Sequence, residues 1–383
     1  MSQRRALWTI YASVAISYLG VGLVAPLISI VLSQHGADTF VVGLVGTTMF
    51  TFFTLAAFPI GYLTDRVGAR PVLSGGLIVY GTAIFMFSQI RPIWLFFAVR
   101  AIEGVGAAAI SVATETMIGA MSDPSQRAKR MSYYALSVGL GWAMGPVGGT
   151  TLFQIHHSLP FVGCCGLSLA AALLVSAYAP QTNSGDHHVG SLWSVLTRKM
   201  VVPVSAGSIY GYLMSSLITL FPLYLKDKGI PEVLMGTILT SVIVGTIVCQ
   251  IPLGWAADFY GKDKVLLGCG LLLAVLFWLL PLSSAWWYYV GIGTIVGGLA
   301  GSLYPIGLSI VGSAVRPARL GAATSLFSLA FGTGSLVGPS LSGLAMHHLG
   351  YNWLFYLPAM LTAIMSLEIL IVNKRAVHVV QAD

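Results

Sequence analysis

Charged residues are scarce in this sequence. Asp, Glu, Lys and Arg make up 8% of the 383 residues, whereas a typical soluble domain contains about 25%. So few charged side chains cannot cover a water-soluble globule of this length, which excludes the ordinary soluble classes. Hydrophobic residues reach 56% and the mean hydropathy is +0.86, so the expected solvent is lipid.

Cysteine is also rare. The four cysteines, Cys164, Cys165, Cys249 and Cys269, all lie within apolar stretches. Their spacing fits neither a disulfide framework nor a zinc site, and they are interpreted as small packing residues. No nucleophile and general base stand in a catalytic arrangement either, so we expect no enzyme activity and no bound metal.

Long apolar runs divide the chain into membrane spans. They are about twenty residues or longer and lack the period-two alternation of barrel strands, so they predict transmembrane helices. Breaks at charges and turn clusters give twelve spans: 7–33, 40–63, 71–89, 93–116, 131–154, 159–179, 201–225, 233–256, 264–282, 285–311, 320–345 and 351–373. A polar segment after the sixth span predicts two helical domains, 1–180 and 200–383, joined by a cytoplasmic linker, 181–199.

The basic residues indicate the orientation. With twelve spans, most Lys and Arg fall on the side of both termini, and the opposite side keeps only Arg91, Lys226 and Lys228. The positive-inside rule therefore predicts that both termini are cytoplasmic. This topology accounts for the net charge of +7, so we expect no nucleic-acid partner.

The two predicted domains share a repeat at an offset of 193 residues. The shared register runs from the second and eighth spans to the fifth and eleventh. The repeated residues are Pro59, Gly61, Asp65 and Gly68 with Pro252, Gly254, Asp258 and Gly261, and Gly141, Gly145 and Pro146 with Gly334, Gly338 and Pro339. Two pseudo-symmetric six-helix bundles of parallel topology are the simplest interpretation.

The segment GYLTDRVGAR (61–70), in the expected loop after the second span, resembles the G-x-x-x-D-R-x-G-R-R signature of the major facilitator superfamily. The matching residues are Gly61, Asp65, Arg66, Gly68 and Arg70, and Ala69 departs from the pattern; the second copy keeps Gly254, Asp258 and Gly261. The resemblance implies the major facilitator fold and a cytoplasmic latch that holds the two bundles together when the cavity opens outward. The alternative is a plain basic loop that fixes the topology.

Two charges lie within the fourth span, where RAIEGVGAAA (100–109) resembles another pattern of the same family, with Glu103 in place of the usual Gln. A charge in mid-bilayer is costly, so Arg100 should face protein or a watery cavity. Glu103 is three residues on and shares its face, so the two can pair. We interpret Glu103 as the residue that binds and releases a coupling proton; a purely structural ion pair is the alternative.

Two further acids lie within or near apolar spans. Glu115 lies about 18 Å further towards the cytoplasm than Glu103, at 1.5 Å per residue, and is interpreted as a latch partner of Arg66 or Arg70; a second proton site is the alternative. Glu368 lies near the inner end of the twelfth span and is interpreted as an interfacial carboxylate.

The fifth and eleventh spans carry GWAMGPVGG (141–149) and GSLVGPSLSG (334–343). Both resemble the G-x-x-x-G-P-x-x-G-G signature of antiporters of the superfamily, and the resemblance implies export. The matching residues are Gly141, Gly145, Pro146 and Gly149, and Gly334, Gly338 and Pro339. Physically, the glycines allow close helix packing and the proline bends the helix.

The substrate cavity should lie between the bundles near mid-membrane. Its candidate lining residues are polar or aromatic at mid-span positions: Thr51, Tyr134, Trp142, Tyr210, Gln250, Tyr304 and Ser328. The scarcity of charges favours an amphipathic or apolar substrate. We therefore expect a monomeric exporter of the bacterial inner membrane that exchanges protons for a small organic compound, with no other cofactor.

Three alternatives come from the same sequence. A gradient-driven importer of a sugar or metabolite would prefer a more polar cavity. A lipid flippase would need an apolar lateral path for the acyl chains. A membrane receptor or scaffold that transports nothing would need a sizeable cytoplasmic interaction domain, and the sequence contains no candidate segment for one.

Overall fold

The structure is a computed structural model that describes residues 3–122, 126–182, 197, 200–315 and 319–380. These residues form twelve long helices and a short 3-10 helix, η3 (Leu280–Leu282). The helices are α1 (Gln3–Gln34), α2 (Thr39–Val67), α3 (Ala69–Met86), α4 (Ile93–Ala120), α5 (Arg127–Ile155), α6 (Leu159–Tyr178), α7 (Val201–Asp227), α8 (Glu232–Tyr260), α9 (Lys262–Leu279), α10 (Trp286–Ala314), α11 (Leu320–Leu349) and α12 (Trp353–Val380). Most of the predicted linker 181–199 lies outside the described residues.

Every predicted span corresponds to one helix, so the all-α polytopic fold is confirmed. Ten of the described helices are long and apolar enough to cross a membrane. The two long helices that fall short, α5 and α11, are rich in Gly, Ser and Thr. Both contact helices of the other half of the chain, so neither depends on lipid contact around its whole circumference.

The predicted loop at 61–70 is wrong. Residues 61–67 continue α2, and α8 continues to Tyr260 in the same way. The helices end at Gly68 and Gly261, whose φ angles are +91° and +100°. Only glycine adopts such a backbone without strain, so these two glycines, and not the charged residues before them, turn the chain into α3 and α9.

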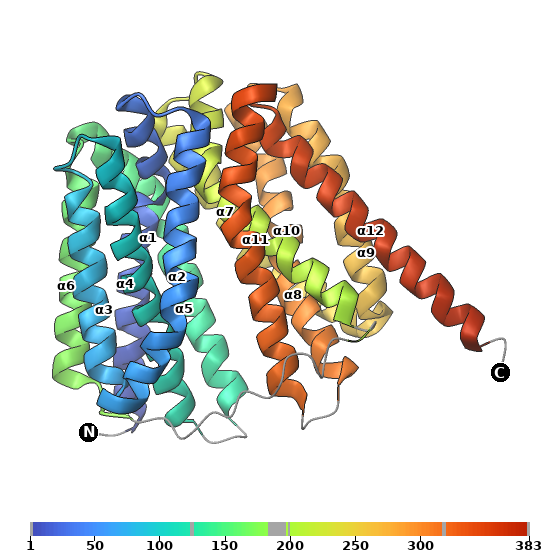
Figure 1. Cartoon of the computed structure of the whole chain (residues 1–383), viewed down its shortest axis with the longest axis horizontal. Helices are drawn as coiled ribbons and strands as arrows, with labels where there is room; N and C mark the ends of the chain where they lie inside the picture. Colours follow the sequence, from blue (N-terminus) through green and yellow to red (C-terminus); the bar gives the residue numbers. More distant parts are fainter. Residues whose placement is uncertain (1–2, 123–125, 183–196, 198–199, 316–318, 381–383) are drawn as a thin grey trace.

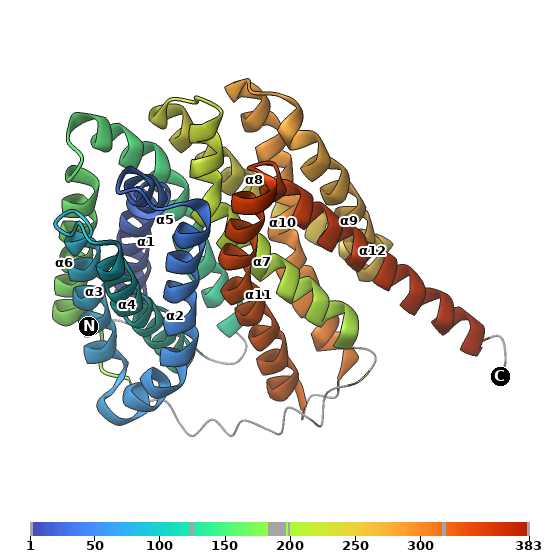
Figure 2. The same ribbon diagram turned by 45° about the horizontal axis from the view of Figure 1, so that its top comes forward.

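The helices form two groups of the same construction (Figures 1 and 2). In the first group α1 packs on α5 and α2 on α4, and in the second α7 packs on α11 and α8 on α10. The groups meet where α2 packs on α11 and α5 on α8, with a further contact between α1 and α7. Figure 1 shows that α1 begins and α12 ends on the same side of the molecule, towards which the two groups separate.

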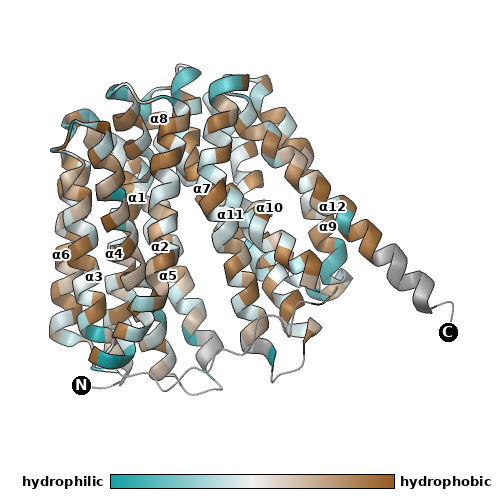
Figure 3. Ribbon diagram, viewed as in Figure 1, coloured by the Kyte–Doolittle hydropathy of each residue, from teal (hydrophilic) through white to brown (hydrophobic). Residues whose placement is uncertain are grey.

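Hydropathy matches a membrane environment. In Figure 3 hydrophilic residues gather mainly at the ends of the helices, while apolar residues follow their bodies. Large apolar side chains such as Phe58, Leu173 and Trp287 are 84%, 71% and 65% exposed. Such exposure would be unfavourable in water and is ordinary where side chains face lipid.

Glycines set the closest approach of helices within each group. A Cβ on Gly141 of α5 would lie 2.6 Å from the Ala15 carbonyl oxygen of α1, and a Cβ on Gly334 of α11 would collide with the Ser208 carbonyl of α7. These two contacts are related by the repeat offset. The antiporter-like glycines therefore pack α5 and α11 against the first helix of their own group.

We expect Gly334→Ala to destabilise the protein by about 1–3 kcal/mol, because the added methyl group overpacks backbone against backbone. Gly332→Ala, two residues earlier on the same helix, is the control, since its Cβ would lie 3.6 Å from Thr54 Oγ1 in ordinary contact. Thermal unfolding of the detergent-purified variants measures both effects. Equal melting temperatures for the two variants would contradict the packing described here.

Candidate functional site

Arg100 and Glu103 form a buried ion pair on α4. Arg100 Nη1 donates hydrogen bonds to both carboxylate oxygens of Glu103, at 2.8 and 3.0 Å. Their side chains are only 11% and 3% exposed, and the guanidinium carbon lies 5.8 Å from the centroid of the Phe87 ring. The predicted pairing is confirmed, as a buried charge requires; its role in proton coupling stays a prediction.

The ion pair lies next to the boundary between the two groups of helices. Arg100 Nε has no hydrogen-bond partner among the described residues. A small void beside it is lined by Ser29 of α1, Val42 of α2 and Thr219 of α7. Since α7 belongs to the second group, a change in the contact between the groups changes the surroundings of Arg100 directly.

Hydroxyl groups join the two groups where their helices meet. Thr47 Oγ1 of α2 donates to the Leu336 carbonyl oxygen of α11 at 3.0 Å and accepts from the Ser340 N–H at 3.2 Å. On the opposite side, Thr240 Oγ1 of α8 donates to the Ala143 carbonyl oxygen of α5 at 2.9 Å. Residues 47 and 240, and 143 and 336, are each related by the repeat offset, so the two bonds are symmetric.

The carbonyls that accept these bonds lie three residues before a proline. Pro146 of α5 and Pro339 of α11 have no N–H and disturb the helical hydrogen bonds of the preceding turn. Gly236 faces the Pro146 carbonyl and Gly43 faces the Pro339 carbonyl so closely that a Cβ on either glycine would collide with it. The antiporter-like prolines therefore sit at the contact between the groups.

We call this contact the seam and define it by its residues. They are Gly43 and Thr47 of α2 with Leu336, Pro339 and Ser340 of α11, and Gly236 and Thr240 of α8 with Ala143 and Pro146 of α5. The seam lies towards the ends of the helices that are remote from the start of α1. Two contacts continue it there, from Thr39 Oγ1 to the Gly343 carbonyl oxygen at 3.1 Å and from His347 Nδ1 to Asp38 Oδ2 at 3.6 Å.

The predicted latch lies at the other end of the molecule. A Cβ on Gly61 or Gly254 would meet nothing within 4 Å, and the side chains of Asp65, Arg66 and Asp258 are exposed. Arg66 stacks on the Tyr62 ring, with 4.9 Å from its guanidinium carbon to the ring centroid. The structure thus has a closed seam and an open latch end, and the latch itself stays a prediction for the opposite conformation.

Glu115 lies among tyrosines from both groups of helices. Its Oε1 accepts a hydrogen bond from Ser111 Oγ at 3.1 Å, and its charge acts on the phenols of Tyr18, Tyr134 and Tyr304. The side chain is nevertheless exposed, so it faces an open space between the groups. Among the described residues it forms no ion pair, and the expected pairing with Arg66 or Arg70 is not made in this conformation.

Aromatic rings face this space from the second group. Tyr304 of α10 lies 5.6 Å from Tyr210 of α7 and 5.4 Å from Phe331 of α11, between ring centroids. Phe327 lies 5.0 Å from Tyr304, and the Tyr304 hydroxyl interacts with the exposed Ser328. The structure therefore brings together three predicted cavity residues, Tyr210, Tyr304 and Ser328.

The other predicted cavity residues are more scattered. Tyr134 of α5 lies close to Tyr18 and Ser111, but Thr51 donates a hydrogen bond to the Thr47 carbonyl oxygen of its own helix at 2.8 Å. Trp142 is partly buried on α5 and Gln250 is exposed on α8. The sequence prediction missed Tyr18, Ser111, Phe327 and Phe331. Ser111 could have been found because it lies one helical turn before Glu115.

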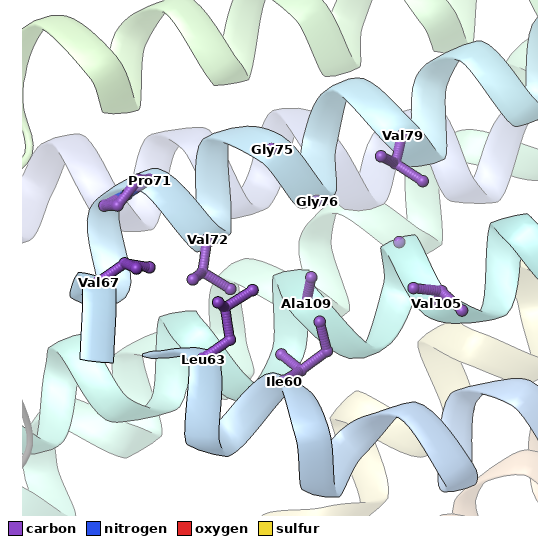
Figure 4. Close-up of a pocket in the computed structure, with 11 residues that line it drawn as sticks. Ile60, Leu63, Val67, Pro71, Val72, Gly75, Gly76, Val79, Val105 and Ala109 are labelled. Atoms are coloured by element: carbon purple, nitrogen blue, oxygen red, sulfur yellow. The ribbon is translucent and has the colours of Figure 1, made fainter. Parts of the chain in front are cut away.

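A separate groove of about 250 Å³ lies between α2, α3 and α4 (Figure 4). Ile60 and Leu63 of α2, Val72 and Val79 of α3 and Val105 of α4 line it. Its lining side chains are all apolar, so it offers no group that binds a proton or orients a polar substrate. The charged and hydroxyl groups described above lie outside this groove.

Comparison with known proteins agrees with this architecture. The family model described as Major Facilitator Superfamily matches residues 10–231 and 203–382. An uncharacterized MFS-type transporter of Bacillus subtilis, YfkF, is 30% identical over 90% of this chain and 89% of its own length. An uncharacterized MFS-type transporter of Escherichia coli O45:K1, YcaD, is 26% identical over 92% of each chain.

Solved structures share the fold at low sequence identity. A bacterial homologue of the human lysosomal transporter Spinster, in an inward-facing and unoccupied conformation, has a TM-score of 0.80 at 12% identity and covers 97% of each chain. The nucleoside transporter NupG has a TM-score of 0.80 at 14% identity and covers 98% of this chain and 100% of its own. At such identity the likeness concerns the fold alone.

We expect the double variant Thr47→Val and Thr240→Val to weaken the closed seam. Each threonine hydroxyl donates one hydrogen bond between the two groups, and such a bond stabilises the closed seam by about 0.5–1.5 kcal/mol. A cysteine in place of Thr219, in a background without the four native cysteines, should then react several-fold faster with a membrane-impermeant maleimide. Thr82→Val is the control, because Thr82 bonds only carbonyls of its own helix, at 2.8 and 3.0 Å. An unchanged rate in the double variant would show that these hydroxyls do not hold the seam.

Proposed function

This chain belongs to the Major Facilitator Superfamily and is a membrane transporter, and we propose that it exports a small amphipathic organic compound in exchange for protons. We place it in the bacterial inner membrane, as a monomer with both termini in the cytoplasm. Alternating access of a central site between the two groups of helices is the mechanism. The proton is the only coupling species that the proposal requires.

One observation carries the proton coupling: the buried Arg100–Glu103 pair lies beside the seam. The void at Arg100 is bordered by Thr219 of the opposite group, so opening the seam removes part of the wall around the pair and admits water. A guanidinium at 2.8 Å stabilises an ionised carboxylate. Hydration and movement of Arg100 weaken that stabilisation, and Glu103 can then take a proton from the side on which the seam opens.

The closed seam corresponds to the step in which an exporter takes up its substrate. With cytoplasmic termini, the open latch end faces the cytoplasm and the closed seam faces outwards. A substrate then enters the space around Glu115 from the cell interior. The resemblance of the seam helices to the antiporter signature favours the same direction. Because Glu103 lies on the seam side, it would be loaded with a proton after the substrate has left.

The coupling energy is sufficient for accumulation. Each proton that moves inwards gains about 2.3 kcal/mol per 100 mV of membrane potential, and about 1.4 kcal/mol corresponds to a tenfold concentration ratio. One proton per cycle therefore sustains a substantial outward gradient of a neutral compound. If the substrate is a monovalent cation, one-for-one exchange moves no net charge, and the pH gradient supplies about 1.4 kcal/mol per pH unit instead.

We expect Glu103→Gln to abolish transport that is driven by a pH gradient, while exchange of substrate across the membrane without a gradient continues. Glutamine preserves the size of the side chain and removes the titrating group. The measurement uses proteoliposomes and a panel of radiolabelled amphipathic compounds of positive, negative and zero charge, in order to select one that the unaltered protein accumulates.

Glu368→Gln on α12 is the matched control, since it removes a carboxylate remote from the seam, and it should transport like the unaltered protein. If gradient-driven accumulation continues undiminished in Glu103→Gln, Glu103 is not the coupling residue and the pair is structural.

A further inference from the structure

The Glu115 carboxylate has no cationic partner among the side chains that the structure describes. Arg100, on the same helix, is engaged by Glu103 at 2.8 Å, and Arg66 stacks on Tyr62. Within the described part of the chain, neither Lys, Arg nor His forms an ion pair with Glu115. A carboxylate on a membrane-spanning helix is costly without compensation, so the site is arranged to receive a positive charge from elsewhere.

The hydroxyl groups around Glu115 are already ordered. Ser111 Oγ donates to Glu115 Oε1 at 3.1 Å, and the Tyr134 hydroxyl lies close to the side chains of Tyr18 and Ser111. This network fixes the carboxylate on the wall formed by α1, α4 and α5. One oxygen of Glu115 accepts the serine bond, which leaves the other available to a ligand.

The opposite wall differs in chemistry because the repeat has diverged at these positions. The equivalents of Ser111, Glu115 and Tyr134 in the second half of the chain are Tyr304, Leu308 and Phe327. Tyr304 and Phe327 belong to the ring cluster with Tyr210 and Phe331, whose centroids are 5.0 to 5.7 Å apart. One wall thus carries the negative charge and hydroxyls, and the other carries aromatic faces.

We propose that the substrate is an organic cation with an aromatic or other bulky apolar part, which binds between Glu115 on the first wall and the rings of Tyr210, Tyr304 and Phe331 on the second, which the buried Phe327 supports from behind. Glu115 supplies the counter-charge, and aromatic faces attract a cation and pack its apolar part. Since the two walls belong to different halves, such a ligand joins them across the site. The inference rests on the proposed transport function for its biological meaning, but its binding test does not require transport.

The test compares two ions of the same shape and opposite charge. Equilibrium dialysis measures the binding of tetraphenylphosphonium and, separately, of tetraphenylborate to the detergent-purified full chain. We expect saturable binding of the phosphonium and at least about tenfold weaker binding of the borate. No saturable binding of the phosphonium, or equal binding of the two ions, overturns the proposal.

Variants then assign the charge to Glu115. Glu115→Gln should weaken phosphonium binding about 10- to 100-fold, as expected for loss of a charged partner, whereas Glu115→Asp keeps the charge and should stay close to the unaltered protein. Glu368→Gln is the control for a carboxylate elsewhere and should bind normally. Size-exclusion chromatography verifies that each variant is folded. Unchanged affinity in Glu115→Gln overturns the assignment.

The result separates this inference from the proton-coupling scheme. Glu103→Gln should bind the phosphonium with normal affinity, even though we expect it to lose gradient-driven transport. If that variant keeps gradient-driven transport, the coupling scheme fails while the cation site stands. If Glu115→Gln binds normally, the cation site fails while the coupling scheme stands.

Discussion

Backbone hydrogen bonding in lipid is the constraint on which this structure depends. A bilayer offers no water to a carbonyl that a helix leaves unsatisfied. Pro146 and Pro339 have no N–H, so α5 and α11 each lose one helical hydrogen bond, and Thr47 and Thr240 of the other half donate to the carbonyls of Leu336 and Ala143, three residues before these prolines. These hydrogen bonds next to the prolines therefore join the two halves at one end. Bonds of this kind are weak enough to exchange for water when that end opens.

Much of the fold follows from the sequence because hydropathy in a membrane is a one-dimensional signal. The number of helices and the internal repeat could be predicted directly from the sequence. The offset of 193 residues relates not only residue types but also hydrogen bonds in the structure, as Thr47–Leu336 and Thr240–Ala143 show. The helix ends were harder. Asp65 and Arg66 suggested a loop, but α2 continues through them to Gly68, since charged side chains at a membrane surface are compatible with a helix.

The site was less predictable than the fold. The Arg100–Glu103 pair could be inferred from a spacing of three residues on one helix, which is local information. The environment of Glu115 could not, because Tyr18, Tyr134 and Tyr304 approach it from three other helices. Sequence spacing suggested the latch arginines as its partners, whereas the described part of the chain places hydroxyl groups near it and no cation in an ion pair with it. Ser111 and Tyr304 are equivalent positions of the repeat, and their difference in residue type could be related to ligand binding only after the structure placed both beside the same space.

The central claim is that the two halves must separate at the seam in every transport cycle. The most direct measurement is reversible cross-linking of cysteines in place of Asp38 and His347, whose side chains lie 3.6 Å apart at the closed end, in a background without the native cysteines. The account predicts that the disulfide stops transport in proteoliposomes and that dithiothreitol restores it. Full transport by completely cross-linked protein would contradict the account.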